Sequence, residues 1–336
     1  YAVDPIGGSY SLNYTNNVNG TWTTTTVESG VDYPNFYRAG NFMVIDSNDN
    51  VHIAFKMEPN YNTDYIKIAN NTDGSWAIST VFTGGASYGS SFYGTGSLAP
   101  PTLAIDSSDN LHMTWARGKI NANFPLYYST NMNGSWDSTQ ITDSNHCGGP
   151  SCPTSINIDS SDNVHLFYYK HHLTSGTAIR DLTHYEIENG SWTSSEIPAT
   201  TCQYHCSQEV VIDSNDNIHI TFVQYANNAA ASVVGTSLKY TNNVGGYFAT
   251  GVTIHDDMYG GSPYESQMIL HPNGNVDFIY AKRTTFGKLA VVADSMDNLE
   301  LNPSMPLYLN NKIASGYNHT CGIIYDNSLL CWGSDY

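Results

Sequence analysis

Basic residues are scarce in this chain. Its 336 residues include 12 Lys and Arg against 30 Asp and Glu, so its formal net charge is -18 at pH 7. A surface this acidic would repel both the phosphates of nucleic acids and the headgroups of anionic membranes. We therefore expect no nucleic acid and no membrane insertion among its interactions.

Long apolar runs and glutamate are also lacking. No uninterrupted apolar stretch approaches the roughly 18 residues that a membrane-spanning helix needs. Only 8 residues are Glu, whereas 22 are Asp and 25 are Tyr, alongside many Asn, Ser, Thr and Gly. This composition favours strands and turns over helices and suits a soluble secreted or cell-surface protein. Because the first residue is Tyr1 rather than Met, either a secretion signal has been removed or the sequence is a fragment.

A repeated segment is the strongest feature of the sequence. Four ten-residue segments align without gaps, at 44–53, 104–113, 157–166 and 211–220, and a degenerate fifth copy spans 269–278. The marker positions 46, 106, 159, 213 and 271 lie 60, 53, 54 and 58 residues apart. Each copy has apolar and polar residues alternating on both sides of a tight polar turn, which predicts a β-hairpin.

A second hairpin with an Asn, Gly or Asp turn follows each copy. Its turns fall at 73–76, 133–136, 189–192 and 244–247, and a looser version spans 287–301. Four antiparallel strands per repeat, in tandem, predict an all-β fold made of β-propeller blades, because one such sheet cannot bury both of its faces alone.

The two ends of the chain decide the expected number of blades. Residues 10–27 form a second hairpin with no first one, and residues 319–332 form a first hairpin with no second one. We therefore predict that residues 10–336 form one six-bladed propeller whose closing blade is shared by the termini, which leaves no open sheet edge. Residues 1–9 would be an N-terminal arm that either folds back on its own blade or adds to a neighbouring subunit, giving head-to-tail self-assembly.

The turn motifs, the Gly-Ser-Trp of the second hairpins and Tyr37-Arg38 together resemble the BNR or Asp-box propellers, the superfamily that includes sialidases. The match covers nearly the whole chain, but the Asp-box pattern Ser-x-Asp-x-Gly-x-Thr-Trp is altered in spacing and acid, as at Asp73-Gly74-Ser75-Trp76. The resemblance implies a propeller fold.

The resemblance to sialidases also implies three carboxylate-binding arginines, a Tyr and Glu couple and an acid. Only Arg38 lies where the family has its Tyr-Arg-Ile-Pro motif, and Ile-Pro is missing here. Asp64, Tyr264 and Glu265 are positional candidates for the other roles. We assign no catalytic residue and expect that the chain is not an enzyme.

The C-terminal segment resembles a single repeat of the RCC1 propeller family. The resemblance rests on Ala-Ser-Gly-Tyr-Asn-His-Thr-Cys-Gly at 314–322 and Cys-Trp-Gly at 331–333. A lone copy fits the closing hairpin, although a chain that continued into further such repeats would look the same.

Six cysteines occur as close pairs, which predicts disulfides in a secreted protein. The pairs are Cys147 with Cys152, Cys202 with Cys206, and Cys321 with Cys331. The last pair is expected on facing strands of one hairpin. A zinc site made from the other four cysteines, with His146 or His205, is the alternative.

Six Asn-x-Ser/Thr sequons are candidate glycosylation sites in a secreted protein. They begin at Asn13, Asn19, Asn70, Asn133, Asn189 and Asn318. Three of them coincide with an Asn-Gly turn, where Asn is favoured for its tolerance of positive φ, so turn chemistry explains half of the sequons.

The repeated acidic and imidazole side chains are expected to be structural, with the carboxylates capping turns and each imidazole bonding a neighbouring turn or backbone group. They are Asp46, His52, Asp106, His112, Asp159, His165, Asp213 and His219. Repetition in separate blades argues against histidines that converge on one metal. Weak calcium binding at the acidic turns is an alternative, and we otherwise expect no cofactor and no metal.

The long loops, all expected on one face of the propeller, should carry the function. They span 32–41, 84–100, 146–153, 170–182, 225–235 and 255–265. Candidate contact residues on that face are Tyr37, Arg38, Tyr93, Arg117, Arg180, Tyr204, Tyr264 and Arg283. Such side chains suit stacking on sugars or packing against another protein.

The predicted function is a non-enzymatic extracellular interaction or assembly module, with a filament subunit as one form of it. Its expected partners are other protein subunits or surface glycans. A glycan-binding lectin and a sialidase-like glycoside hydrolase are the alternatives.

Overall fold

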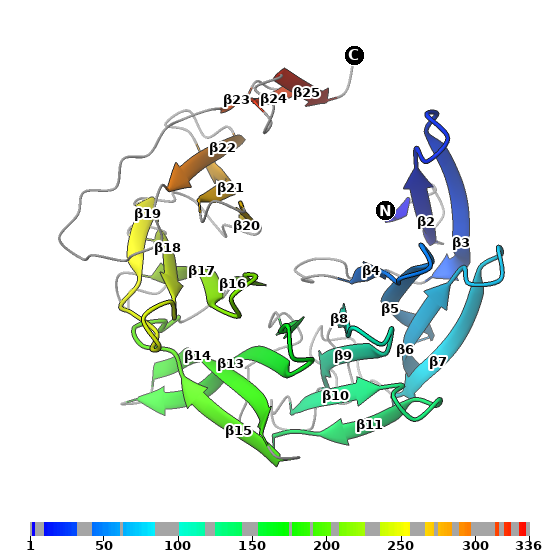
Figure 1. Ribbon diagram of the computed structural model, residues 1–336, viewed down its shortest axis with the longest axis horizontal. Coiled ribbons are helices and arrows are strands. Elements are labelled where there is room, and N and C mark those ends of the chain that lie inside the picture. Colours follow the sequence, from blue (N-terminus) through cyan, green and yellow to red (C-terminus); the bar gives the residue numbers. More distant parts are fainter. Residues whose placement is uncertain are drawn as a thin grey trace. The chain divides into compact units, whose positions relative to one another are not determined.

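The protein is described by a computed structural model (Figure 1). It describes residues 2–3, 10–31, 42–60, 63–84, 101–117, 125–142, 154–174, 177–188, 191–202, 208–225, 236–255, 266–271, 275–283, 289–296, 313–315, 319–323 and 329–333. All regular secondary structure in these residues is β-strand, and none of them forms a helix able to cross a membrane. The structure falls into two compact units, residues 1–171 with 185–193 and residues 172–184 with 194–336.

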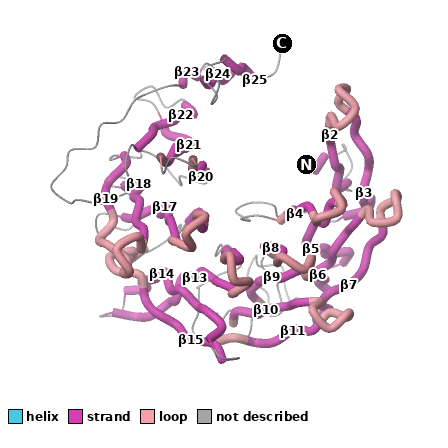
Figure 2. Tube along the Cα trace, viewed as in Figure 1, coloured by secondary structure: helices cyan, strands magenta, loops and turns pink. Residues whose placement is uncertain are grey.

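The strands pair into antiparallel sheets in chain order, as the tandem hairpins of the sequence predict (Figure 2). An N-terminal sheet, which precedes the five numbered by repeat, contains β1 (Ala2–Val3), β2 (Tyr10–Asn16) and β3 (Thr23–Val31). Sheet 1 contains β4 (Met43–Ile45), β5 (Val51–Asn60), β6 (Thr63–Asn70) and β7 (Ala77–Thr83). Sheet 2 contains β8 (Thr102–Ile105), β9 (Leu111–Ala116), β10 (Leu126–Thr130) and β11 (Asp137–Gln140).

The later repeats form sheets of the same kind. Sheet 3 contains β12 (Thr154–Ile158), β13 (Val164–Thr174), β14 (Thr177–Glu188) and β15 (Ser191–Glu196). Sheet 4 contains β16 (Gln208–Ile212), β17 (Ile218–Tyr225), β18 (Thr236–Asn242) and β19 (Val252–His255). Sheet 5 contains β20 (Ser266–Leu270), β21 (Val276–Arg283) and β22 (Leu289–Met296), and a last sheet contains β23 (Ile313–Ser315), β24 (His319–Ile323) and β25 (Leu329–Gly333).

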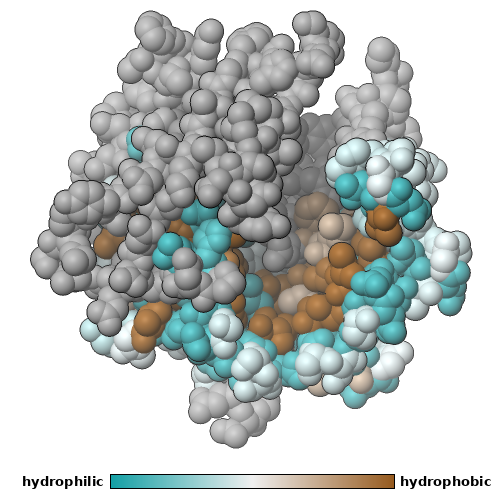
Figure 3. Space-filling view, turned by 45° about the horizontal axis from the view of Figure 1, so that its top comes forward, coloured by the Kyte–Doolittle hydropathy of each residue, from teal (hydrophilic) through white to brown (hydrophobic). Residues whose placement is uncertain are grey.

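Successive sheets of one unit pack against each other through apolar side chains. Ile66 and Ile68 of sheet 1 pack with Met113 and Trp115 of sheet 2, and all four are at most 2% exposed. In the second unit, Tyr240 of sheet 4 packs in the same way against sheet 5. Figure 3 shows hydrophobic side chains in a band across the first unit, with hydrophilic side chains on its outer margin. Central strands such as β9 are buried on both faces because a sheet covers each side.

The architecture confirms the predicted all-β fold of four-stranded antiparallel sheets. Among the described residues, four sheets have four strands and three have three. The hairpin β24–β25 lies where the sequence predicts it, with Cys321 opposite Cys331. Residues 2–3 of the N-terminal arm pair with β2, and Ala2 lies opposite Leu12. A sixth blade shared by the two termini stays a prediction.

The expectation of a long loop over residues 170–182 is wrong. Strand β13 continues to Thr174 and strand β14 begins at Thr177, so this region is an extended hairpin. The backbone of Arg180 forms a further bridge, because its N–H and C=O both bond to Cys202, at 2.8 and 2.7 Å. The physical reason is that Leu, Thr, Ile and Ala on both sides of the short Ser-Gly connection continue the strand pattern.

Candidate functional site

The repeated aspartate of each first hairpin organises its own turn. In sheet 1, Asp46 Oδ1 accepts the backbone N–H groups of Asn48 and Asn50, at 2.9 and 2.8 Å. Its Oδ2 accepts the Asn50 side-chain amide at 3.0 Å and lies 3.1 Å from His52 Nε2. Burial by itself would raise the pKa of Asp46, but these hydrogen bonds outweigh it and the pKa is lowered. The carboxylate is therefore charged and fully used within the turn.

The same arrangement recurs in the next three sheets. Asp106, Asp159 and Asp213 each accept two backbone N–H groups and the side-chain amide of an Asn. Hydrogen bonds again outweigh burial, which would raise the pKa, so the pKa of each of these carboxyls lies below its usual value. These turns have the chemistry that the sequence pattern predicts for them.

The repeated histidine completes the network from the neighbouring strand. Nε2 of His112 lies 3.3 Å from Asp106 Oδ2, and Nε2 of His219 lies 3.3 Å from Asp213 Oδ2. The other ring nitrogen, Nδ1, is 2.6 Å from the hydroxyl of Tyr128 or Tyr240. Burial lowers the pKa of both histidines. A neutral ring that donates from Nε2–H and accepts the Tyr hydroxyl at Nδ1 satisfies every atom.

Sheet 5 contains the same pair with its partners exchanged, a feature that the sequence pattern alone left unrecognised. His271 stands at the aspartate position and Asp277 at the histidine position, and their Nε2 and Oδ2 atoms are 2.8 Å apart. The aligned repeats contain the signal, because the fifth copy has a His at the position of the repeated Asp and an Asp at the position of the repeated His. The fifth copy therefore keeps the contact although it loses the motif.

A second aspartate of each turn ties consecutive sheets of the first unit together. The carboxylate of Asp109 accepts the backbone N–H of Ser47 at 2.9 Å and also its hydroxyl. Asp162 accepts the N–H and hydroxyl of Ser107 at 2.8 and 2.6 Å. Both aspartates have positive φ, near 62°, which Asp tolerates better than most residues. Since these oxygens already accept hydrogen bonds, calcium could bind at the turns only by breaking those hydrogen bonds.

The turns of the second hairpins contribute another recurrent contact. The side-chain oxygens of Asn71, Asn131 and Asn243 accept the N–H of the first residue of β5, β9 and β17, at 2.6 to 2.7 Å. Positive φ falls on the glycines of these turns, for example Gly134 at 77°, and not on the preceding Asn. The expectation that Asn133 and Asn19 are selected for positive φ is therefore wrong, because the glycine takes that conformation at lower steric cost.

The sequons differ in accessibility. Asn13 is buried at 8% exposure, and its side-chain oxygen accepts the Thr26 hydroxyl at 2.9 Å. Asn70 is partly buried and accepts the Thr72 hydroxyl at 2.9 Å. Asn19 and Asn133 are exposed. Asn189 and Asn318 lie outside the described residues.

Most of the candidate contact face lies outside the described residues. This holds for Tyr37, Arg38, Tyr93, Tyr204, Tyr264 and the side chain of Arg283. Glu265, a positional candidate for the sialidase couple, also lies outside them. Arg117 is described, and its guanidinium lies 5.5 Å above the ring of Phe82. Phe82 in turn contacts Trp115, with ring centroids 4.3 Å apart. Arg117 thus belongs to an aromatic cluster at one end of sheets 1 and 2.

Two further charged groups are held inside sheets. Asp64, a positional candidate for the sialidase acid, is fully buried and lies 3.4 Å from the ammonium of Lys56, which is also buried. The pair is therefore a buried salt bridge, and its carboxylate has a cation beside it. In sheet 4, burial raises the pKa of Glu209 to about 7.

The cysteine pattern is described at one position. Cys202 is fully buried and disulfide-bonded, and none of the cysteines in the described part of the chain is free. A disulfide sulfur is not a thiolate, so Cys202 cannot serve in the alternative zinc site. Cys147, Cys152 and Cys206 lie outside the described residues.

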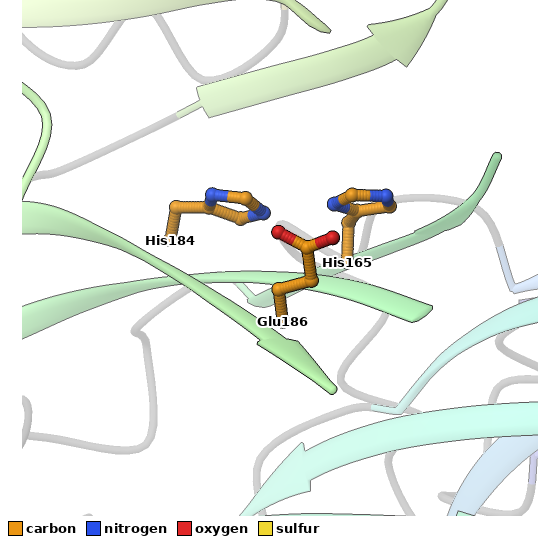
Figure 4. A group of neighbouring side chains, drawn as sticks. All are labelled: His165, His184 and Glu186. Atoms are coloured by element: carbon orange, nitrogen blue, oxygen red, sulfur yellow. The ribbon is translucent and has the colours of Figure 1, made fainter. Parts of the chain in front are cut away.

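Three metal-ligating side chains come together in sheet 3, where His165 of β13 meets His184 and Glu186 of β14 (Figure 4). One ligand atom from each lies within 4.8 Å of the other two. Both histidines are buried and Glu186 is partly exposed. The repeat pattern predicts a structural role for His165, and no motif marks His184 or Glu186. The signal was their departure from the residues at the same place in sheets 2 and 4.

Comparisons with known proteins support the propeller fold and the C-terminal motif. The family model described as Regulator of chromosome condensation (RCC1) repeat matches residues 311–336. No curated protein matches the chain. An alpha-L-arabinanase of Penicillium chrysogenum complexed with arabinobiose is similar in structure, with a TM-score of 0.53 and 13% identity over 88% of this chain and 87% of that one.

Two other solved structures are similar. An alpha-L-arabinofuranosidase of Fusarium graminearum with an iminosugar inhibitor has a TM-score of 0.50 and 12% identity over 88% of this chain and 86% of that one. A protein of unknown function from Dyadobacter fermentans has a TM-score of 0.49 and 12% identity over 94% of both chains. At such low identity the arabinanase and the arabinofuranosidase show the fold alone. The chain is therefore an all-β protein of the β-propeller type with an RCC1-like repeat at residues 311–336.

Proposed function

We propose that the chain is a non-enzymatic interaction module of the cell surface or extracellular space, built as a six-bladed propeller of the Asp-box type. The observation that carries this proposal is the repeated network of Asp, His, Ser and Asn in the turns. It gives sheets 1 to 4 the same fixed frame, while the loops between repeats differ in length and sequence. A rigid scaffold with variable loops is the common design of binding proteins.

The same network argues against catalysis at the repeated residues. The carboxylates and imidazoles that could act as acid and base, such as Asp106 and His112, are buried and paired with each other and with turn groups. Asp64 is likewise held against Lys56. Burial raises the pKa of Glu209 to about 7, a value that suits proton transfer, and this favours the enzyme alternative.

The N-terminal arm provides a route to assembly. Ala2 and Val3 pair with only two residues of the seven-residue strand β2. The same short pairing made by the arm of another copy would join subunits head to tail, which produces filaments when the contacts do not close.

If the N-terminal arm joins subunits head to tail, we expect native material to contain polymers and a chain lacking residues 1–9 to form none. Electron microscopy and light scattering of the native and shortened chains measure this. A chain with Ala2 and Val3 replaced by Gly, which weakens strand pairing but keeps the length, is the matched control and should also lose polymers. Polymers of undiminished length in the shortened chain would contradict a role of the arm.

A glycan is the second candidate partner, because two of the similar structures carry sugar-like ligands, arabinobiose and an iminosugar. Tyr37, Tyr93, Tyr204 and Tyr264 of the predicted loop face would supply stacking surfaces. We expect a glycan array to give binding without release of reducing sugar, and replacement of these Tyr residues by Ala to reduce that binding at least tenfold. Turnover of the bound glycan that is lost on Arg38→Ala would instead identify a hydrolase.

A further inference from the structure

We propose that His165, His184 and Glu186 form a binding site for a divalent transition-metal ion of the zinc class within sheet 3 (Figure 4). Their ligand atoms lie within 4.8 Å of one another. Two imidazoles and one carboxylate are a donor set that Zn²⁺ takes in proteins, with a fourth position left for water or substrate. The site is independent of the proposed interaction function.

Sheet 3 differs from sheets 2 and 4 at the positions of two of the three proposed ligands, His184 and Glu186. His184 stands where sheets 2 and 4 have Tyr128 and Tyr240, two residues after a buried Leu in each case. In those sheets the Tyr hydroxyl lies 2.6 Å from Nδ1 of the repeated histidine. Glu186 stands where sheets 2 and 4 have Thr130 and Asn242. A hydroxyl that bonds one imidazole is thus replaced by a second imidazole, and a neutral polar group by a carboxylate.

The outer contact that a metal-bound histidine needs is already present. Nε2 of His165 lies 3.3 Å from Asp159 Oδ2. Metal-ligating histidines commonly donate their second ring N–H to a carboxylate, which fixes the ring and makes the ligating nitrogen more basic. With Nε2 used in this way, Nδ1 is the ligating atom of His165, and in sheets 2 and 4 it is Nδ1 that faces the position of His184.

Burial and charge favour a cation here. His165 and His184 are 6% and 8% exposed, so a bound ion would be largely shielded from water. Asp159 and Glu186 supply two carboxylates beside it, within a chain whose net charge is -18. Tetrahedral zinc with bonds of about 2.0 to 2.1 Å places its ligands about 3.3 Å apart. Small rotations of the three side chains on binding would close the remaining gap.

Zinc binding by the whole chain tests the proposal. After treatment with EDTA and its removal, isothermal titration calorimetry with Zn²⁺ should detect one site per chain, and the Tm should rise with added zinc. The variant with both His184→Tyr and Glu186→Thr copies Tyr128 and Thr130, which the same chain already accommodates in sheet 2. We expect it to fold, to bind zinc at least 100-fold more weakly, and to lose the zinc-dependent rise in Tm.

The reciprocal change provides the matched control. The variant with both Tyr128→His and Thr130→Glu builds the same ligand set around His112 and should bind two zinc ions per chain. If the His184→Tyr variant does not fold, Glu186→Gln keeps the shape of the site and should still weaken zinc binding at least tenfold. The proposal is wrong if the native chain binds no zinc, or if these variants bind it with the stoichiometry and affinity of the native chain.

Discussion

Replacing Asp106 by Ala is expected to lower the free energy of unfolding by about 2 to 4 kcal/mol, because several donors lose one charged acceptor together. Asp106 is 9% exposed and accepts hydrogen bonds from two backbone N–H groups and from Asn110 Nδ2. Its Oδ2 also pairs with His112. Removing it takes the acceptor from all of these donors, and His112, which is 1% exposed, cannot replace it with water, so its unpaired Nε2–H is costly. Urea unfolding followed by circular dichroism measures the change.

Two matched variants separate this network from a general loss of charge. Asp106→Asn keeps the size of the side chain, but its NH₂ faces the donors Asn110 Nδ2 and His112 Nε2, so we expect a loss of about 2 kcal/mol. Asp137→Ala removes an exposed carboxylate from strand β11 of the same sheet and should change stability by less than about 0.5 kcal/mol. Equal effects of Asp106→Ala and Asp137→Ala would contradict a structural role of the network.

Stability is expected to fall in two stages as the pH is lowered. Burial lowers the pKa of His112 and His219 below the ordinary histidine value of 6.5, so below that pH the unfolded chain binds protons that the folded chain does not. Each histidine then lowers the free energy of unfolding by up to about 1.4 kcal/mol per pH unit, until the pH reaches the pKa of that histidine in the folded chain. The repeated turn carboxyls have pKa values below the ordinary 3.8, so they add to the free energy of unfolding above pH 3.8, and this stabilisation is lost as the pH falls below it. These are Asp46, Asp106, Asp159 and Asp213.

Urea unfolding between pH 8 and pH 3 measures both stages. We expect little change down to about pH 7, a decline that begins near 6.5, and a further decline below about 4. The variant His219→Gln keeps a donor toward Asp213 but cannot be protonated, so it should be less stable at pH 8 and lose less on acidification to pH 5. A profile that stays flat from pH 7 to pH 5 would show that these histidines are not held neutral.

Much of the fold follows from the sequence because each repeat is specified locally. The alternating apolar residues and the Asp-Ser-x-Asp-Asn turn mark the first hairpin of four repeats, and the structure has a strand pair at each of these four. The extended hairpin of β13 and β14 was missed because its connection is only Ser175-Gly176 and its flanks include polar residues such as Lys170 and Arg180. Polar residues at strand ends are hard to distinguish from a loop.

The candidate sites were less accessible to sequence reasoning, because they depend on which residues face each other across strands. The turn carboxylates could be assigned as caps from the sequence. Nothing in the sequence indicated that Asp109 would accept a hydrogen bond from Ser47 of the preceding repeat, 62 residues away. The cluster of His184 and Glu186 with His165 becomes visible only when β14 is placed in register with the strands of the other sheets. The long loops vary too much between repeats for any pattern to fix their side chains.

The bonds from Ser47 to Asp109 and from Ser107 to Asp162 run in one direction along the chain, each turn donating to the next. A series of this kind can be lengthened by duplicating a repeat, since the new copy brings one donor and one acceptor. It also has a last member. The fifth copy has Pro272 and Gly274 where the others have Ser and the second Asp, so it can neither give nor receive this bond. Heat or mechanical load should therefore separate sheets 4 and 5 more readily than it separates sheets 1 and 2 or sheets 2 and 3.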